Sequence, residues 1–397
     1  MRYEWKSMKL SDIAIFNPAE QIKRGAVAKK VPMDKLVPFC RDVTEYSIEP
    51  YNGGTKFRNG DTVMARITPC LENGKTAKIS FLDEGEVGFG STEYIVFRAK
   101  ADMADPDYLY YLICSPAVRE PAIKSMVGSS GRQRVQTDVV KNLEICVPSL
   151  HEQQKIGSLL RSIDDRIELN RRINNNLEQQ AQAFFKSWFV DYVPFGGSAP
   201  KEWKIDVLDD ITSLVSRGIT PKYSDSSDQI VINQKCIRNH MIDLSLARTH
   251  IPKAINEKWL RFGDLLINST GDGTLGRVAQ IWFEPKNLTV DSHVTIARPA
   301  RENLVFYIGF WGILHEKEIE SLHTGSTGQT ELPRDRVKAM ELLLPDNETL
   351  DRFNAIIAPM TAAIVSNQKE SNKLAEVRDA LLPKLMSSEI DVSDIQL

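Results

Sequence analysis

The sequence lacks the segments that mark membrane and secreted proteins. No stretch approaches the ~18–20 consecutive apolar residues of a transmembrane helix, and the first residues, MRYEWKSMKLSD, contain no apolar signal core. The cysteines are scattered and form no C-x-x-C pair, as is typical of reduced thiols: Cys40, Cys70, Cys114, Cys146 and Cys236. These absences predict a cytoplasmic protein.

Positive charge is not in excess either. The 397 residues include 50 Lys and Arg against 53 Asp and Glu, which gives a net charge of −3. Because simple nucleic-acid-binding proteins are usually basic, any DNA affinity must come from local basic patches or from a partner subunit. Hydrophobic residues make up 42% and charged residues 26%, as in ordinary globular proteins, and the length predicts two or three domains.

The common signatures of catalytic and cofactor sites are missing. Gly74-Lys75-Thr76 resembles the end of a P-loop, but Pro69 stands where the first glycine is needed. No Pro-Pro pair is present for an amino-methyltransferase motif, and the six histidines form no H-x-x-x-H pair. The glycine-rich segment 271–276 is followed by strand-like sequence, where a dinucleotide loop would open a helix. We therefore expect no catalytic residue, metal or cofactor on this chain.

The strongest positive signal is an internal repeat of about half the chain. Matching segments follow one another in the same order, at offsets of 197 to 203 residues: 4–6 with 202–204, 59–61 with 262–264, 127–133 (VGSSGRQ) with 324–330 (TGSTGQT), and 147–148 with 344–345. Each half begins with ~145 residues of irregular, strand-like sequence. A short helix is expected at 106–115 and at its counterpart, 304–315.

Each half then ends in a long helix with a heptad pattern of seam residues at spacings of four and three. The two seams match at an offset of 197 and include Ile163, Ile167, Asn170, Leu177, Phe184, Ile364, Asn367, Leu374 and Leu381. Asn170 and Asn367 occupy equivalent positions and are expected to hydrogen-bond to each other and fix the register. Pro359 should kink or delay the second helix.

Equal helices with matched seams favour antiparallel pairing with each other, although each could instead pack only on its own domain. The sequence predicts an α+β fold, with two repeated, β-rich α/β domains separated by two long antiparallel coiled-coil helices and related by pseudo-two-fold symmetry. The expected boundaries are 1–150 for the first domain, 151–190 for its helix, 191–202 for a connector, 203–346 for the second domain, 347–386 for its helix and 387–397 for a tail.

Basic, polar and glycine-rich loops recur at equivalent places in the two halves. Backbone amides and hydroxyls suit phosphate oxygens, and Arg, Lys, Asn and Gln suit base edges, although the same loops could simply be solvated. The candidates in the first half are Lys23, Arg24, Lys29, Lys30, Arg66, Gly128, Ser129, Gly131, Arg132, Gln133 and Arg134. Those in the second half are Arg217, Thr220, Lys222, Tyr223, Lys235, Arg238, Asn239, Ser326, Thr327 and Gln329.

Over essentially its whole length, the chain resembles the DNA-specificity (S) subunit of type I restriction–modification enzymes. The resemblance rests on the repeated W-x-x-x-x-L-x-D-I opening, the NGD and FGD turns, the GSSGRQ and GSTGQT loops, the segment VPSLHEQQKI at 147–156 and a long helix ending in FKSWF. The second helix departs from this pattern, because its start, LPDNETLDRF, lacks the Glu-Gln-Gln run.

The resemblance implies a non-catalytic subunit in which each half holds a target-recognition domain and a spacer helix. Such a subunit reads a bipartite DNA target, and its paired helices set the gap. It recruits two methyltransferase (M) subunits, which bind S-adenosylmethionine, and two restriction (R) subunits, which use ATP and Mg²⁺. The alternatives are a coiled-coil scaffold with two β-rich interaction domains and a self-contained DNA methyltransferase or nuclease.

Overall fold

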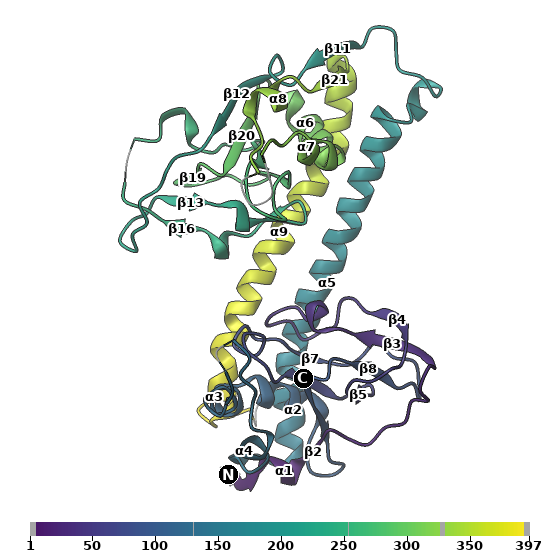
Figure 1. Cartoon of the computed structure of the whole chain (residues 1–397), viewed down its shortest axis with the longest axis vertical. Helices are drawn as coiled ribbons and strands as arrows, with labels where there is room; N and C mark the ends of the chain where they lie inside the picture. The colour runs from purple at the N-terminus through teal and green to yellow at the C-terminus, as the bar shows by residue number, and fades with distance from the viewer. Residues whose placement is uncertain (1–4, 130, 253, 326–329, 393–397) are drawn as a thin grey trace. The chain divides into compact units, whose positions relative to one another are not determined.

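The structure is a computed structural model that describes residues 5–129, 131–252, 254–325 and 330–392. It divides into two compact units (Figure 1). The first unit consists of Met1–Asn170 together with Glu370–Leu397, and the second consists of Arg171–Lys369. The two longest helices each contribute one part to each unit. In the described part of the chain, no helix is both long enough and apolar enough to cross a membrane.

The first unit contains two four-stranded sheets and a two-stranded ribbon. One sheet is antiparallel, in the order β2 (Ala14–Phe16), β9 (Tyr94–Ala99), β6 (Thr62–Ala65), β7 (Thr76–Lys78). The other has the order β4 (Ser47–Pro50), β3 (Val27–Val31), β8 (Gly88–Gly90), β5 (Lys56–Phe57), with only β3 and β8 parallel. The ribbon pairs β1 (Lys6–Lys9) with β10 (Glu144–Val147).

Helices complete the core of this unit. They are α1 (Leu10–Ile13), α2 (Pro106–Cys114), α3 (Pro116–Lys124), α4 (Thr137–Lys141), the first part of α5 (Leu150–Phe189) and the last part of α9 (Asn347–Met386). Leu109 of α2, Leu160 of α5 and Leu385 of α9 are all buried in one hydrophobic cluster. The cluster therefore joins the domain to both long helices.

The second unit repeats this arrangement. Its main sheet has the order β12 (Thr212–Arg217), β20 (Val294–Pro299), β17 (Leu265–Asn268), β18 (Val278–Gln280). A smaller sheet has the order β16 (Arg248–Thr249), β13 (Ile230–Ile232), β19 (Leu288–Val290), with β13 and β19 parallel. Two ribbons pair β11 (Lys204–Val207) with β21 (Glu341–Leu344) and β14 (Ile237–Arg238) with β15 (Met241–Ile242).

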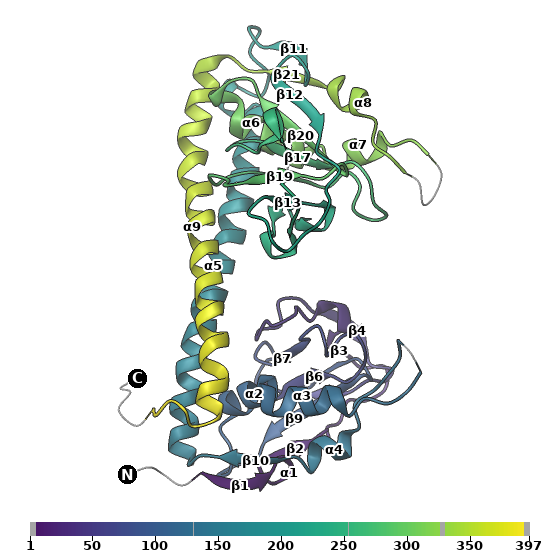
Figure 2. The same ribbon diagram turned by 90° about the vertical axis from the view of Figure 1, so that its left-hand side faces the viewer.

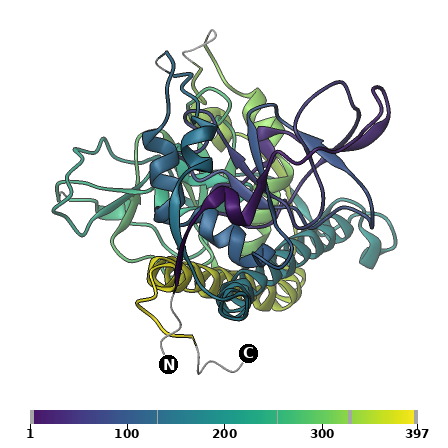
Figure 3. The same ribbon diagram turned by 90° about the horizontal axis from the view of Figure 1, so that it is seen from below.

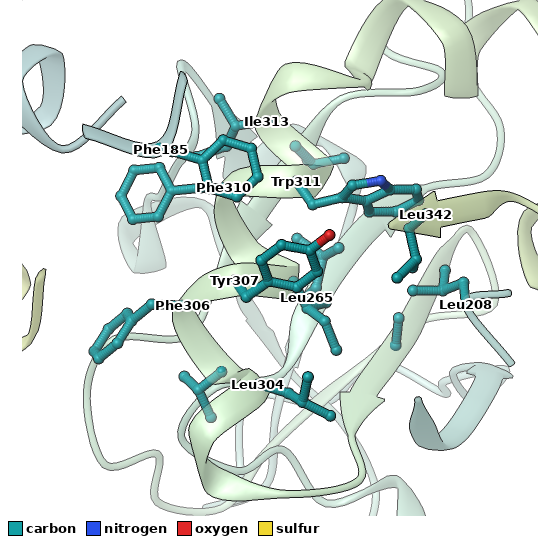
Figure 4. Packing of buried hydrophobic residues seen from close by; sticks show 14 of the residues in the cluster. Phe185, Leu208, Leu265, Leu304, Phe306, Tyr307, Phe310, Trp311, Ile313 and Leu342 are labelled. Atoms are coloured by element: carbon teal, nitrogen blue, oxygen red, sulfur yellow. The ribbon is translucent and has the colours of Figure 1, made fainter. Parts of the chain in front are cut away.

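The helices of the second unit are α6 (Val305–Leu314), α7 (Glu316–Ser321), α8 (Arg334–Lys338) and the remaining parts of α5 and α9. Tyr307 and Phe310 of α6 pack with Phe185 of α5 in the main hydrophobic cluster (Figure 4). The short helices expected near 106–115 and 304–315 are confirmed as α2 and α6.

Both long helices are 40 residues long and begin at a side-chain cap. At the start of α5, the Ser149 hydroxyl accepts a hydrogen bond from the Glu152 amide, and the Glu152 carboxylate accepts one from the Ser149 amide. At the start of α9, Asp346 accepts a bond from the Thr349 amide at 2.9 Å. The expected delay by Pro359 is wrong, because α9 begins at Asn347 and runs through this proline.

The helices pair antiparallel within each unit, which confirms the expected pairing. In the first unit, the ribbons of α5 and α9 run side by side (Figures 2 and 3). There, Arg166 of α5 binds Glu370 at 2.9 Å and Asp164 binds Arg378 at 2.7 Å. In the second unit, the Asn367 amide donates a hydrogen bond to Asn174 at 2.9 Å. In both units, later residues of α5 meet earlier residues of α9.

The predicted seam residues are buried or half-buried, with one exception. Ile163 and Ile364 are buried, whereas Ile167, Leu177, Leu374 and Leu381 are half-buried. Phe184 was expected in the seam but is 38% exposed, and Phe185 is buried instead at 3%. The aromatic cluster on α6 draws in Phe185, so the seam shifts by one residue there.

The two seam asparagines have partners on the opposite helix. The buried Asn170 amide donates hydrogen bonds to Glu370 and Ser371, and Asn367 donates to Asn174. The two contacts are equivalent in the repeat. At the offset of 197, Asn170 corresponds to Asn367, and Ser371 corresponds to Asn174. The direct bond expected between Asn170 and Asn367 would join the two units and stays a prediction.

Candidate nucleic-acid interface

The glycine-rich loops 127–134 and 324–331 have the same closure in the two units. The amides and carbonyls of Val127 and Arg134 bond to each other at 3.0 and 2.9 Å. Those of Thr324 and Glu331 do so at 2.8 and 2.9 Å. Gly128 has a φ of +136°, a conformation that strongly favours glycine. Each loop therefore has a narrow base.

Each loop base is tied to the end of a strand of the main sheet. The Val135 amide donates to the Arg66 carbonyl at 2.8 Å, just after β6. At the equivalent place, the Leu332 amide donates to the Ser269 carbonyl at 2.9 Å, just after β17. The sheet thus fixes where each loop leaves the domain.

Buried ion pairs hold the turns that precede these two strands. Asp61 of the NGD turn binds Arg98 of β9 through two contacts of 2.7 Å. Asp264 of the FGD turn binds Arg298 of β20 through two contacts of 2.8 Å. Bidentate pairs of this kind fix orientation as well as distance. The repeat revealed the two turns, but their arginine partners were not foreseen.

An ion pair of reversed polarity lies at the base of each loop. Arg134 binds Glu93 at 2.6 Å, and this contact lowers the pKa of the Glu93 carboxyl. In the second unit, Glu331 occupies the position of Arg134 and pairs with Arg217 of β12. Arg134 and Arg217 therefore hold their loops in place and offer little free charge to DNA.

Two further predicted cations, Lys29 and Lys30 of β3, are also engaged by carboxylates. Lys29 binds Glu86 at 2.8 Å and Asp83 at 2.9 Å, and these bonds raise the pKa of its ammonium group. Lys30 binds Glu49 at 2.7 Å. DNA contact by Lys29 and Lys30 stays a prediction. Each ammonium group would have to bind DNA and its carboxylate partner at the same time.

The remaining predicted cations are more available. Six of them are exposed, and their side chains form no hydrogen bond or ion pair with other described residues: Lys23, Arg24, Arg132, Lys222, Lys235 and Arg238. Arg66 and Gln133 are half-buried, whereas Ser129, Gly131 and Thr220 are exposed. Ser326, Thr327 and Gln329 lie outside the described residues. The structure groups Ser129, Gly131 and Arg132 on one loop.

A tight turn carries Arg238 and Asn239 toward α5. Asn239 and His240 both have positive φ, 48° and 59°, and join β14 to β15. The turn lines a polar groove of about 900 Å³, shared with α5 and the loop at 271–276. His240 Nδ1 lies 3.0 Å from Glu178 Oε1, and this hydrogen bond raises the pKa of the imidazole. No pattern in the sequence indicates this contact, because Glu178 lies on α5, 62 residues from His240.

Tyr223 lies beside β16 and supports an arginine that the repeat did not reveal. The segment around Tyr223 pairs with the strand, since the Ile251 amide donates to the Lys222 carbonyl at 2.8 Å. The guanidinium carbon of Arg248 lies 3.7 Å from the centre of the Tyr223 ring. Arg248 is exposed. The two residues are 25 positions apart in the sequence, so only the strand pairing brings them together.

Within the described residues, no group of three or more His, Cys, Asp or Glu side chains lies close enough together to hold a metal ion. What the two units share is a set of loops, cations and polar side chains carried by equivalent strands. This arrangement can present hydrogen-bond donors to phosphates and base edges.

Comparisons with known proteins point to one family. A family model described as the type I restriction modification DNA specificity domain matches residues 3–179. The type I restriction enzyme MjaIX specificity subunit of Methanocaldococcus jannaschii is 28% identical over 314 residues, which cover 73% of this chain and 70% of that protein. The HindI specificity subunit of Haemophilus influenzae is 24% identical over 411 residues, covering 84% and 87%.

A solved structure shares the fold. The S subunit of a type I restriction–modification system from M. genitalium matches with a TM-score of 0.57 and 15% identity, covering 97% of this chain and 96% of that one. The matching family model, the relatives that align over most of their length and the shared fold agree with the repeated loops and paired helices. Residues 3–179 therefore match the type I restriction modification DNA specificity domain, and over most of its length the chain is similar to specificity subunits of type I restriction enzymes.

Proposed function

We propose that the chain recognises DNA sequence for a type I restriction–modification complex, and that each unit reads one part of a bipartite target. The observation that carries this proposal is the repetition of the loop base. Loops 127–134 and 324–331 are closed by the same backbone bonds and tied to the ends of equivalent strands. A chain with two equivalent surfaces for DNA recognition suits a DNA target in two parts.

The chain is the specificity component rather than a catalytic one, because the relatives that it matches over most of their length are named specificity subunits. We propose two M subunits, two R subunits and double-stranded DNA as its partners in the cytoplasm. S-adenosylmethionine, ATP and Mg²⁺ would be bound by those partners. With a net charge of −3, this chain leaves part of the nonspecific attraction for phosphate to the partner subunits.

The paired helices are the proposed spacer and docking surface for the M subunits. The antiparallel pairing within each unit supports a spacer role, because ion pairs and amide hydrogen bonds fix the register of α5 against α9. A coiled-coil scaffold would need the same helices, but it would not need two loops with matching bases. The family matches also disfavour a self-contained methyltransferase or nuclease.

Exchange of one domain tests the proposal. Residues 206–340 are replaced by the equivalent region of a relative with a different target, and the complex is expressed with its M subunits. Mapping of methylated bases across the host genome should show that one part of the bipartite motif changes while the other stays. Exchange of residues 9–143, at the offset of 197, is the matched control and should change only the other part. If either exchange altered both parts, the modular proposal would be wrong.

A further inference from the structure

Arg248 lies close over an aromatic ring, and its hydrogen-bond donors are left without a partner among the described residues. Its guanidinium carbon lies 3.7 Å from the centre of the Tyr223 ring, the close approach of a cation–π stack. With the described residues, the side chain of Arg248 forms no hydrogen bond or ion pair. The guanidinium thus keeps its five N–H donors available for a ligand.

Both members of the stack stand on ordered backbone. Arg248 belongs to β16, which pairs with β13. The chain next to Tyr223 is joined to that strand, since the Ser224 amide donates to the Thr249 carbonyl at 3.1 Å and the Thr249 hydroxyl donates to the Ser224 carbonyl at 2.5 Å. A side chain that is already ordered loses less conformational entropy when it binds.

Other arginines of the second unit differ from Arg248 in what they contact. Arg217 pairs with Glu331, and Arg298 is buried against Asp264. Arg277 donates to the Gly273 carbonyl at 2.7 Å. Arg238 is exposed, with no ring beneath it among the described aromatic contacts. Arg352 also lies over a ring, but it is 5.5 Å from the centre of Trp188, whereas Arg248 approaches its ring to 3.7 Å. Among these arginines, Arg248 thus combines the closest ring contact with free donors.

The first unit has cation–ring contacts of a different kind. Lys29 lies 5.7 Å from the centre of the Tyr46 ring, and Lys56 lies 5.3 Å from that of Tyr51. Both ammonium groups are already bonded, Lys29 to two carboxylates and Lys56 to the Glu20 carbonyl at 2.8 Å. Arg119 lies 5.2 Å from the centre of the Phe39 ring, and it already donates to the Glu72 carbonyl at 2.7 Å. Within the described part of the first unit, each cation found over a ring is thus engaged in another bond.

We propose that Arg248, supported by Tyr223, reads the major-groove edge of a guanine in the part of the target that the second unit recognises. The inference rests on the proposed function of the chain. A planar guanidinium fork matches the O6 and N7 acceptors of guanine, although it can also bind two phosphate oxygens. A base offers its two acceptors only in the plane of its edge, whereas phosphate oxygens can be approached from many directions, so a guanidinium restricted by its contact with Tyr223 suits a base edge better.

The test uses the full chain in complex with its M subunits. Methylation mapping first gives the motif of the wild-type complex, and the exchange of residues 206–340 identifies the part read by the second unit. Competition binding then compares a duplex carrying this motif with duplexes in which each G·C pair of that part is replaced in turn. The variants are Arg248→Lys, which keeps the charge and removes the fork, and Tyr223→Leu, which removes the aromatic ring beneath it. Lys286→Ala removes an exposed charge near β19, at the opposite edge of the same sheet.

Arg248→Lys should lower discrimination at a single G·C pair by roughly 5- to 150-fold, the range for a bidentate base contact. Tyr223→Leu should lower discrimination at the same G·C pair, Lys286→Ala should keep it, and thermal unfolding of all variants should match the wild type. Unchanged discrimination in Arg248→Lys would overturn the inference. An equal loss on every duplex with a flatter salt dependence would also overturn it, because that result marks a phosphate contact. A wild-type complex without a two-part motif would refute the proposed function itself.

Discussion

His240 shows how one side chain can make the second unit sensitive to pH. Its Nδ1 lies 3.0 Å from Glu178 of α5, and its Nε2 lies 3.6 Å from Glu316 of α7. The same turn carries Arg238 and Asn239. Protonation of the imidazole would give both carboxylates a cationic partner, and the turn would then be held against α5 and α7 by charge as well as by hydrogen bonding.

The second unit should lose stability as pH rises through the raised pKa of His240. The hydrogen bond to Glu178 raises this pKa above its ordinary value of 6.5, so the stabilisation is fully present below 6.5 and disappears above the raised pKa. Thermal unfolding from pH 6 to 8.5 should show this loss in the wild type and not in His240→Gln. The exposed His323 supplies the control variant His323→Gln, which should keep the wild-type profile. Parallel profiles for wild type and His240→Gln would contradict the prediction.

Single residues also mark the limit of what the sequence predicts. The repeat identified Asp61 and Asp264 through their Gly-Asp turns, but Arg98 and Arg298 lie 37 and 34 residues away and were not found. Arg134 was predicted as a DNA contact, yet its equivalent in the second half is Glu331. Which charge pairs with which depends on strands that meet only in the folded chain, so the composition of a loop does not reveal its free charge.

At the level of elements, the long helices were the most predictable part of the fold. Their heptad pattern and equal spacing depend on local sequence, and Ser149 and Asp346 fix their first turns. The short strands were less predictable, because β3 and β8 form a parallel pair over only two positions, far apart in the chain. Phe185 is buried in the seam in place of the expected Phe184 for a similar reason. Its contacts with α6, a segment far away in the sequence, outweigh the heptad spacing of α5.

Removing Pro359 from α9 should stabilise the second unit. Pro359 is exposed within the helix and has no N–H to donate to the Ala355 carbonyl. Pro359→Ala restores that bond, and a proline is about 3 kcal/mol less favourable than alanine inside a helix. After allowing about 1 kcal/mol for the greater freedom of the unfolded chain, we expect a gain of about 2 kcal/mol in urea denaturation.

Pro116→Ala is the matched control for that measurement. Pro116 lies in the first turn of α3, where a missing N–H breaks no helical hydrogen bond. This variant gains no hydrogen bond and should lose up to about 1 kcal/mol, because the unfolded chain gains the same freedom. If Pro359→Ala gained no more than Pro116→Ala, α9 would have to be distorted around Pro359 in solution.

At the scale of the whole molecule, the spacer role of the helices can be tested by lengthening them. One heptad is inserted after Leu177 and another between Ala363 and Ile364, the facing point given by the Asn174–Asn367 bond. Each helix grows by ~10 Å at 1.5 Å per residue, which corresponds to about three base pairs at ~3.4 Å each. The gap in the methylated motif should lengthen by about three base pairs, or methylation should be lost.

Loss of methylation is also consistent with a rigid spacer, because three added base pairs rotate the second part of the target by roughly a third of a turn. Genome-wide methylation mapping separates the outcomes. Full methylation at the original spacing would contradict the spacer role. A heptad inserted in α5 alone is the control for disturbed pairing, and it should unfold or inactivate the chain rather than change the gap.

The first unit is closed by residues from the far end of the chain, and this affects how the protein is made. Leu385, Met386 and Val392 complete its core, whereas the second unit is the continuous stretch Arg171–Lys369. Domains usually fold in the order in which the ribosome synthesises them. Here a nascent chain that has reached Lys369 holds every residue of the second unit and still lacks part of the first. The later-synthesised unit can therefore fold to completion first, and limited proteolysis of ribosome-bound chains should cut the earlier one preferentially.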